Sequence, residues 1–240
     1  MSNNKSVLLA GKSSAGKTAS LRNLKNSKGV MYLNCEAGKD LPFANNFKVL
    51  KIKDPLKVYQ YFDAAEEHKQ CHTIVVDTLT YLMDMFESNY VLTAANTMKA
   101  WSDYAQYFKK LMQYYVVKST KNIIFLAHTM DILNESEMVM ETFIKVKGAL
   151  MNQGIESYFN NVIACKKVAL SDLVDCKSSL LNITPEEEAL GFKYVYQTRL
   201  TKKTVNERIR GPLGLWPVEE IFIDNDLQLV LDKLQTYYTE

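Results

Sequence analysis

The chain has 240 residues, of which 47% are hydrophobic and 23% charged, the balance of a globular protein that can bury a sizeable core. A formal net charge of +2 excludes a nucleic-acid interface built on overall charge, so any basic surface has to be local. Four scattered cysteines without a C-x-x-C pair argue against a zinc site or a disulfide framework, and no apolar run approaches the roughly 20 residues of a membrane span.

The first expected strand, at residues 6–10, leads directly into the phosphate-binding pattern G-x-x-x-x-G-K-[ST]. Gly11 and Gly16 allow the backbone to bend so that N–H groups converge on phosphate oxygens at a helix N-terminus. Lys17 supplies a charge for the β- and γ-phosphates, and Thr18 a hydroxyl for Mg²⁺. The alternative is a turn rich in Gly and Ser. The pattern predicts a nucleoside triphosphate site formed by Gly11, Lys12, Ser13, Ser14, Ala15, Gly16, Lys17, Thr18 and Ala19.

Strands and helices are expected to alternate along the rest of the chain. The expected strands are 29–34, 47–52, 73–77, 122–127, 161–170 and 192–200, the last paired with 204–209, and the expected helices are 18–24, 54–70, 101–115 and 226–238. Residues 129–155 are expected to form a mobile loop that ends in a helix, and 171–191 an insertion at the sheet edge. The alternation predicts a single three-layer α/β domain over 1–240, with a mainly parallel central sheet, an antiparallel hairpin at its edge and a C-terminal helix.

Three polar residues follow expected strands, where a parallel sheet places its ligands. Asp77 stands where a Walker B acid holds Mg²⁺, although an Asp there can also cap the next turn. Glu36 can orient and polarise the attacking water, or be a solvated loop residue. His128 can donate a hydrogen bond to the γ-phosphate, or have a purely structural role.

Other nucleotide-binding classes fit the sequence less well. The GTPase patterns D-x-x-G and N-K-x-D do not occur, and four Arg residues are few for the lid of a small-molecule kinase. An ATPase that hydrolyses its nucleotide fits best.

The segments V-M-Y-L-N-C-E-A (30–37), T-I-V-V-D-T (73–78) and F-L-A-H-T (125–129) resemble, in order and spacing, three sites of the RecA core. These sites are its catalytic-glutamate strand, its Walker B strand and its sensor strand. Nearly the whole chain resembles the short phage-encoded RecA-like ATPases, the phage nucleotide-binding AAA group. The shared motifs are G-x-S-x-x-G-K-T-x-S-L-R at 11–22, W-x-D-Y at 101–104, Y-Q-T at 196–198 and the closing N-D-L-x-L-V segment at 225–238.

The resemblance implies an Mg²⁺-dependent ATPase that acts on single-stranded DNA in phage recombination, annealing or replication, in the cytoplasm of a phage-infected or prophage-carrying host. It implies a homo-oligomer, as a ring or a filament, with ATP between neighbours. A single-strand DNA-binding protein or another replication protein is a further candidate partner. No membrane association is expected. Carried over to this sequence, Lys17, Thr18 and Asp77 hold the phosphates and Mg²⁺, Glu36 activates water, and His128, where RecA usually has Gln, senses the γ-phosphate.

Two further sites follow from the resemblance. Residues 131–153 correspond to the second DNA-binding loop of RecA, with Lys145 and Lys147 as the expected DNA contacts. Arg208 and Arg210 lie where RecA-like proteins place cations that reach a neighbour's γ-phosphate, although two exposed cations on a hairpin are the alternative. The N-terminus leaves no room for a signal peptide or for the extension that latches RecA subunits together, so a ring or a transient oligomer is expected as readily as a filament.

Three alternatives remain open. An ATPase of the helicase-loader type would act on a replication protein, and the acidic stretch 135–141 favours it. A nucleotide kinase would use Arg208 and Arg210 within one chain. A nucleotide-binding module without turnover is disfavoured, because Lys17, Thr18, Glu36 and Asp77 are all present.

Overall fold

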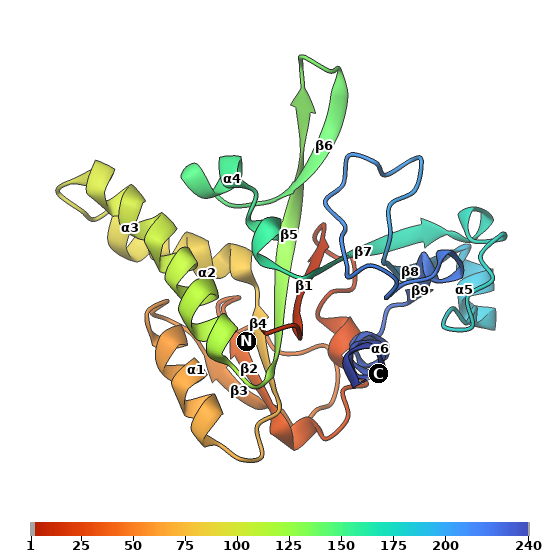
Figure 1. The fold of residues 1–240 in the computed structure, drawn as a ribbon, viewed down its shortest axis with the longest axis horizontal. Coiled ribbons are helices and arrows are strands. Elements are labelled where there is room, and N and C mark those ends of the chain that lie inside the picture. The colour runs from red at the N-terminus through yellow and green to blue at the C-terminus, as the bar shows by residue number, and fades with distance from the viewer. Residues whose placement is uncertain (1–2, 240) are drawn as a thin grey trace.

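The computed structural model describes residues 3–239, which fold around one large sheet (Figure 1). Its strands are β1 (Ser6–Gly11), β2 (Val30–Asn34), β3 (Lys48–Lys51), β4 (Thr73–Asp77), β5 (Asn122–Asn134), β6 (Val139–Ile144), β7 (Asn161–Ala169), β8 (Phe192–Gln197) and β9 (Phe222–Asp224). The strand order is β3-β2-β4-β5-β1-β7-β8-β9, and β6 pairs with β5 off this path. Neighbours from β3 to β7 are parallel, whereas β8 and β9 add to the edge antiparallel.

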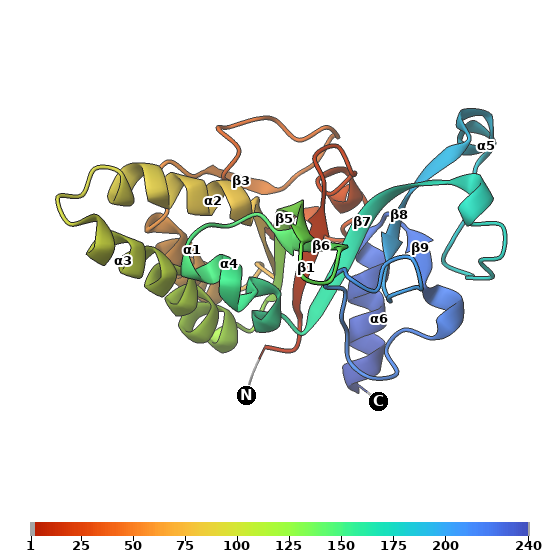
Figure 2. The ribbon, with the colours of Figure 1, turned by 90° about the horizontal axis from the view of Figure 1, so that it is seen from above.

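Helices cover both faces of this sheet. They are α1 (Lys57–Glu67), α2 (Leu79–Phe86), α3 (Thr97–Lys110), α4 (Ala149–Gln153), α5 (Pro185–Leu190) and α6 (Leu227–Thr239). Figure 2 shows α1 to α4 on one side of the parallel strands and α6 on the other. Within residues 3–239, no helix combines the length and the hydropathy needed to cross a membrane.

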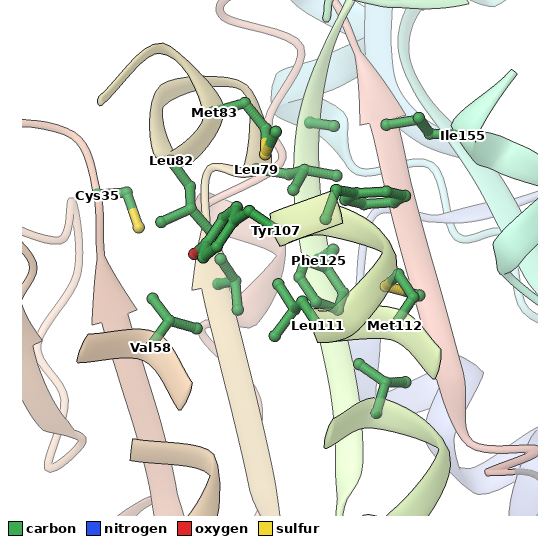
Figure 3. Close-up of a cluster of buried hydrophobic side chains, with 14 of the residues drawn as sticks. Cys35, Val58, Leu79, Leu82, Met83, Tyr107, Leu111, Met112, Phe125 and Ile155 are labelled. Carbon is green, nitrogen blue, oxygen red and sulfur yellow. The ribbon is translucent and has the colours of Figure 1, made fainter. Parts of the chain in front are cut away.

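Side chains of the parallel strands alternate between two cores because successive residues of a strand point to opposite faces. On β1, Leu8 packs into the core beneath α1, α2 and α3, whereas Val7 and Leu9 pack into the core beneath α6. Figure 3 shows the first core, in which Leu79 of α2 and Phe125 of β5 are among the buried side chains. Strands buried on both faces explain the continuous apolar runs in the sequence.

The expected α/β architecture is therefore confirmed, with its mainly parallel sheet, antiparallel edge and C-terminal helix. Most expected elements lie within a few residues of their observed bounds. Helix α1 begins later than expected because Asp54 caps a turn before it, accepting the Leu56 N–H at 3.0 Å. Beyond α3, a π-helical stretch continues from Leu111 to Val116.

The helix expected at 18–24 is wrong. Only a 3₁₀ turn at Ala19–Leu21 follows the phosphate-binding loop, and β2 begins at Val30. The Ser20 hydroxyl donates to the Lys17 carbonyl at 2.5 Å, and Asn26 adopts a left-handed conformation with φ 50°. The Ser20 hydroxyl satisfies a backbone carbonyl that a helix would use, and Asn26 reverses the direction of the backbone. The segment therefore does not continue as an α-helix.

The mobile loop expected at 129–155 is also wrong in its first half. Strand β5 continues past Ala127 as far as Asn134 and turns back as β6, so that the two form a long antiparallel hairpin. Cross-strand polar pairs hold it, with the Thr142 hydroxyl donating to Asp131 at 2.9 Å and the Asn134 amide to Glu141 at 2.8 Å. The short helix α4 follows it, where the end of the loop was expected to be helical.

The strand expected at 204–209 does not form. Strand β8 lies between β7 and β9 instead, and Arg210 makes an isolated bridge to Val162. The Thr204 hydroxyl closes a turn by accepting the Thr201 N–H at 2.8 Å, which directs this segment away from β8. Residues 171–191 lie between β7 and β8 in the chain and contain α5 (Figure 1). The N-cap residue of α5, Thr184, forms a capping box with Glu187.

Candidate nucleotide-binding site

The carboxyl ends of four parallel strands bring the predicted residues together. Gly11 at the end of β1 lies opposite His128 on β5, and Asn34 at the end of β2 lies opposite Asp77 on β4. Glu36 follows β2 by two residues. The strand that carries Asp77 is separated from β1 by β5, so His128 lies between the phosphate-binding loop and the acids.

The loop itself requires glycine at both ends of its pattern. A Cβ on Gly11 would come within 2.6 Å of the Cys165 carbonyl oxygen, because the backbone of β7 passes next to it. Gly16 has φ +85°, a left-handed conformation that favours glycine. A Cβ there would also lie 3.2 Å from Asn225 Oδ1 and from the Tyr194 ring. These observations explain both glycines by geometry.

The Lys17 ammonium occupies the centre of this loop. It donates to the carbonyls of Gly11 and Lys12 at 2.9 and 2.8 Å, and it lies 3.2 Å from His128 Nδ1. Lys17 is buried, and burial lowers its pKa. An anion bound in the loop would compensate the free-energy cost of burying the charged ammonium, and a phosphate group is such an anion.

Asp77 is held by two hydroxyl groups on the same oxygen. The Thr18 hydroxyl donates to Asp77 Oδ2 at 2.7 Å, and the Tyr32 hydroxyl at 2.6 Å. The other oxygen, Oδ1, is buried and has no hydrogen-bond partner among residues 3–239, and burial raises the pKa of this carboxyl group. A free carboxylate oxygen beside a hydroxyl fits Mg²⁺, a hard cation that prefers oxygen ligands.

The protein alone offers few metal ligands here. No group of three or more His, Cys, Asp or Glu side chains that could hold a metal ion occurs in the described chain, residues 3–239. This agrees with the usual Mg²⁺ site, in which one or two protein ligands are completed by water and by substrate phosphates. Thr18 and Asp77 are the residues that would hold the ion.

Glu36 and His128 form the outer part of the same arrangement. His128 Nε2 lies 3.6 Å from Glu36 Oε1, and this contact with the imidazole holds the pKa of Glu36 below its usual range. The Asn34 side chain accepts the Glu36 N–H at 3.0 Å and so fixes the backbone here. Lys17, His128 and Glu36 thus form a row from the loop to an ionised carboxylate.

Sequence reasoning missed Tyr32. Its ring belongs to the core beneath α6, and its hydroxyl is the second donor to Asp77. The only signal was a phenol within an apolar strand, since a buried Tyr hydroxyl usually has a hydrogen-bond partner. Which residue accepts the hydrogen bond of the Tyr32 hydroxyl depends on the register of β2 against β4, in which Tyr32 lies opposite Val75.

The two predicted arginines lie outside this site. The Arg208 guanidinium packs over the Phe143 ring at 4.3 Å and lies 3.8 Å from Glu141 of the hairpin. Arg210 is exposed and pairs through its backbone with Val162, near the amino end of β7. Neither side chain lines the cavity at the loop.

The two lysines predicted to contact DNA differ in their surroundings. The Lys147 ammonium is paired with Glu87 at 2.5 Å and lies 3.9 Å from Asp84. Lys145 is exposed, and its N–H donates to the His128 carbonyl at 2.8 Å, next to the sensor position. Of the two, Lys145 is the one available to an anion.

A cavity of about 780 Å³ opens over the phosphate-binding loop. One side is lined by the loop with Glu36, Tyr81 and His128. The other side was not predicted, and it comes from late segments of the chain that contribute Asn182, Thr184, Glu187, Lys193, Tyr194, Asp224 and Asn225.

The fold and the loop define a P-loop ATPase. A family model described as an AAA domain matches residues 3–166, and the chain belongs to this family. The matched part contains Lys17, Glu36, Asp77 and His128 and ends on β7. Among solved structures, a KaiC-like protein from the hyperthermophilic archaeon Pyrococcus horikoshii is similar, with 15% identity over 85% of this chain and 82% of that one and a TM-score of 0.46. The family assignment does not depend on that likeness. The comparison with curated proteins gave no match.

Proposed function

We propose that this protein is an Mg²⁺-dependent ATPase that acts on single-stranded DNA in phage recombination, annealing or replication. The observation that carries the hydrolytic part is the row of Lys17, His128 and Glu36 beside Asp77, at one end of the loop cavity. A cation, a polar sensor and an ionised acid are the groups that phosphoryl transfer to water requires.

Each residue has a defined part in this reaction. Lys17 leaves its two carbonyl partners to bind the β- and γ-phosphates, and Thr18 and Asp77 are the residues that would hold Mg²⁺. A magnesium ion held there would supply positive charge against the phosphates. Glu36 orients a water molecule and accepts its proton as the water oxygen bonds to the γ-phosphorus. The bond from that phosphorus to the bridging oxygen breaks, and ADP and phosphate are released.

The hairpin of β5 and β6 supports coupling to a second ligand. His128 belongs to β5, which continues without interruption into the hairpin, and Lys12 of the loop pairs with Asp131 of the hairpin at 2.7 Å. A second cavity of about 580 Å³ lies between the loop and the hairpin, and its lysines are Lys12, Lys166, Lys167 and Lys203. Three of these lysines pair with acids, Lys12 with Asp131, Lys166 with Glu207 and Lys203 with Asp172, whereas Lys167 has no such acid within 4.0 Å among residues 3–239. Lys167 is therefore the cation of this cavity that favours a phosphate backbone as the ligand.

The positions of Arg208 and Arg210 support action between subunits. Both are exposed and outside the site of their own chain, as a residue that completes a neighbour's site would be. We therefore include a homo-oligomer, ring or filament, in the proposal, with a single-strand DNA-binding protein or another replication protein as a further partner.

A partner-loading ATPase is the second candidate. The observation that favours it is the hairpin tip, where Leu133, Met138 and Met140 are exposed beside Glu135 and Glu137. Apolar and acidic side chains together suit contact with a protein better than contact with DNA.

Steady-state ATP hydrolysis with Mg²⁺, with and without single-stranded DNA, tests the proposal. We expect DNA to raise the rate, double-stranded DNA to raise it less, and the rate to grow faster than linearly with protein concentration. A mixture of inactive Lys17→Ala with Arg208→Ala or Arg210→Ala is expected to regain activity if the arginine acts in trans. Hydrolysis that ignores DNA would contradict the DNA role, and a rate raised by a replication protein would support the second candidate.

A further inference from the structure

We propose that residues 178–191, together with β8 and β9, form a nucleoside-binding wall that holds the base and ribose of ATP. The wall is defined by Asn182, Thr184, Tyr194 and Asn225, which line the loop cavity opposite Glu36 and His128. This inference rests on the proposed function, since it assigns the other half of the same cavity. It gives residues 171–191 a role in choosing the nucleotide.

The direction of the triphosphate follows from the site itself. The γ-phosphate belongs at the end where Lys17, Glu36 and His128 meet, because hydrolysis occurs there. The nucleoside then leaves the loop at its other end, past Ala19 and Arg22, which also line the cavity. A cavity of about 780 Å³ is large enough for a whole nucleotide.

Asn225 provides a free hydrogen-bond donor in this wall. The residue is 5% exposed, and its Nδ2 is buried without a partner in the described part of the chain. The backbone carbonyl of Asn225 accepts a hydrogen bond from Arg22 Nη1 at 3.1 Å, which fixes Asn225 beside the loop. A buried donor left unpaired is costly, and an acceptor on a ligand would satisfy it. Ring nitrogens of a purine and oxygens of a ribose are such acceptors.

Tyr194 provides an aromatic surface next to the phosphates. Its ring lies 3.2 Å from the position of a Cβ on Gly16, so it packs directly against the loop. Phe192 contacts it edge-on, with ring centroids 5.9 Å apart, and the ring remains 38% exposed. An exposed aromatic ring at this distance from the phosphates suits stacking with a nucleobase.

An ion-pair network fastens residues 178–191 to the sheet. The buried Lys193 ammonium lies 2.7 Å from Glu187 and 3.1 Å from Asp224. Asp224 in turn accepts the Asn182 N–H at 3.0 Å and its side-chain amide at 3.1 Å. Glu187 accepts the Thr184 N–H at 2.9 Å, so the network holds both Asn182 and Thr184 before a ligand binds. Such preorganisation lowers the entropic cost of binding.

The test compares binding of a non-hydrolysable ATP analogue with binding of inorganic tripolyphosphate, by calorimetry in Mg²⁺. The wall predicts that wild-type protein binds the analogue more tightly than tripolyphosphate. Tyr194→Ala and Asn225→Ala should each lower the affinity for the analogue roughly tenfold and leave the affinity for tripolyphosphate unchanged. Tyr194→Phe, which retains the ring, should bind like wild type, and Tyr114→Ala, an exposed ring outside the cavity, is the matched control.

The outcomes separate this inference from the proposed function. Equal affinity for the two probes in wild type, or equal weakening of both by Tyr194→Ala, would overturn the wall and leave the P-loop site intact. Failure of the wild type to bind either probe would overturn both proposals. Thermal unfolding of each variant shows that it is folded, and Tyr194→Phe tests the stacking surface should the alanine variants unfold.

Discussion

The parallel half of the sheet, from β3 to β7, and its antiparallel edge of β8 and β9 contribute different chemistry to one cavity. The parallel half contributes Lys17 of the loop after β1 and Glu36 after β2, and Asp77 at the end of β4 lies next to them. The antiparallel edge carries the Tyr194 ring, with the side-chain amide of Asn225 just after β9, and its charged groups Lys193 and Asp224 pair with each other. Our two proposals assign the phosphate chemistry to one half and the choice of nucleotide to the other.

The match to the AAA domain family covers residues 3–166, which include the parallel strands as far as the first residues of β7 that pair with β8. Four substitutions test the parallel half and its hairpin, beginning with the one that should reduce activity most, and a comparison with Tyr194 on the antiparallel edge follows them.

Lys17→Ala removes the cation at the centre of the parallel half. We expect ATP hydrolysis to fall roughly a thousandfold or more, because Lys17 is the cation that lies within the phosphate-binding loop. Steady-state phosphate release measures it. Lys25→Ala, an exposed lysine paired with Asp232 away from the cavity, is the control. A Lys17→Ala enzyme with near-normal turnover would place the chemistry elsewhere.

Glu36→Gln removes the carboxylate that we propose as the acceptor of the proton of water. We expect turnover to fall by on the order of a hundredfold to a thousandfold while ATP binding stays within a fewfold of wild type. Single-turnover hydrolysis and equilibrium binding measure the two quantities. Glu67→Gln, at an exposed position on α1, is the control. Unchanged turnover would show that Glu36 is only a partner of His128.

Tyr32→Phe removes one of the two donors to Asp77 without removing the ring from its core. We expect the Mg²⁺ concentration for half-maximal hydrolysis to rise about tenfold, since groups that orient a metal ligand affect metal affinity to that extent. A Mg²⁺ titration of the rate measures it, with Tyr114→Phe as the control. An unchanged Mg²⁺ requirement would mean that Thr18 alone orients Asp77.

Asp131→Asn tests the contact between the loop and the hairpin. The hydrogen bond from Lys12 lowers the pKa of Asp131, so the pair stabilises the fold above the unfolded pKa of about 3.9 and stops doing so as the pH falls through the lowered value. The pair is largely exposed, so we expect the free energy of unfolding to fall by less than about 1 kcal/mol at pH 7. Thermal unfolding across pH measures it. A difference that persists at the lowest pH would contradict the ion pair as its cause.

The parallel half could be predicted from the sequence because its information is local. The apolar runs of β1 and β4 mark strands covered on both faces, and the loop pattern marks the end of β1. Because these strands are parallel, their carboxyl ends lie at the same edge of the sheet. The sequence alone was therefore enough to place Asp77 and His128 near Lys17.

The antiparallel edge could be predicted only in part. A strand was expected at 192–200, where β8 lies, but its partner β9 was not expected, because this pairing is long-range. Strand β9 has three residues, too few for a periodic pattern. It pairs with β8 at the position where residues 204–209 were expected. The ion pairs of Lys193 join residues 187 and 224, far apart in the chain. The hairpin of β5 and β6 was missed because its alternation is interrupted by polar residues that pair across the strands.

A comparison of kcat and KM for ATP in Glu36→Gln and Tyr194→Ala, under one set of conditions, tests whether the two halves of the cavity have separate roles. We expect Glu36→Gln to lower kcat with little change in KM, and Tyr194→Ala to raise KM roughly tenfold with little change in kcat. A lowered kcat and an unchanged KM in Tyr194→Ala would contradict the division, because the antiparallel edge would then take part in the phosphate chemistry.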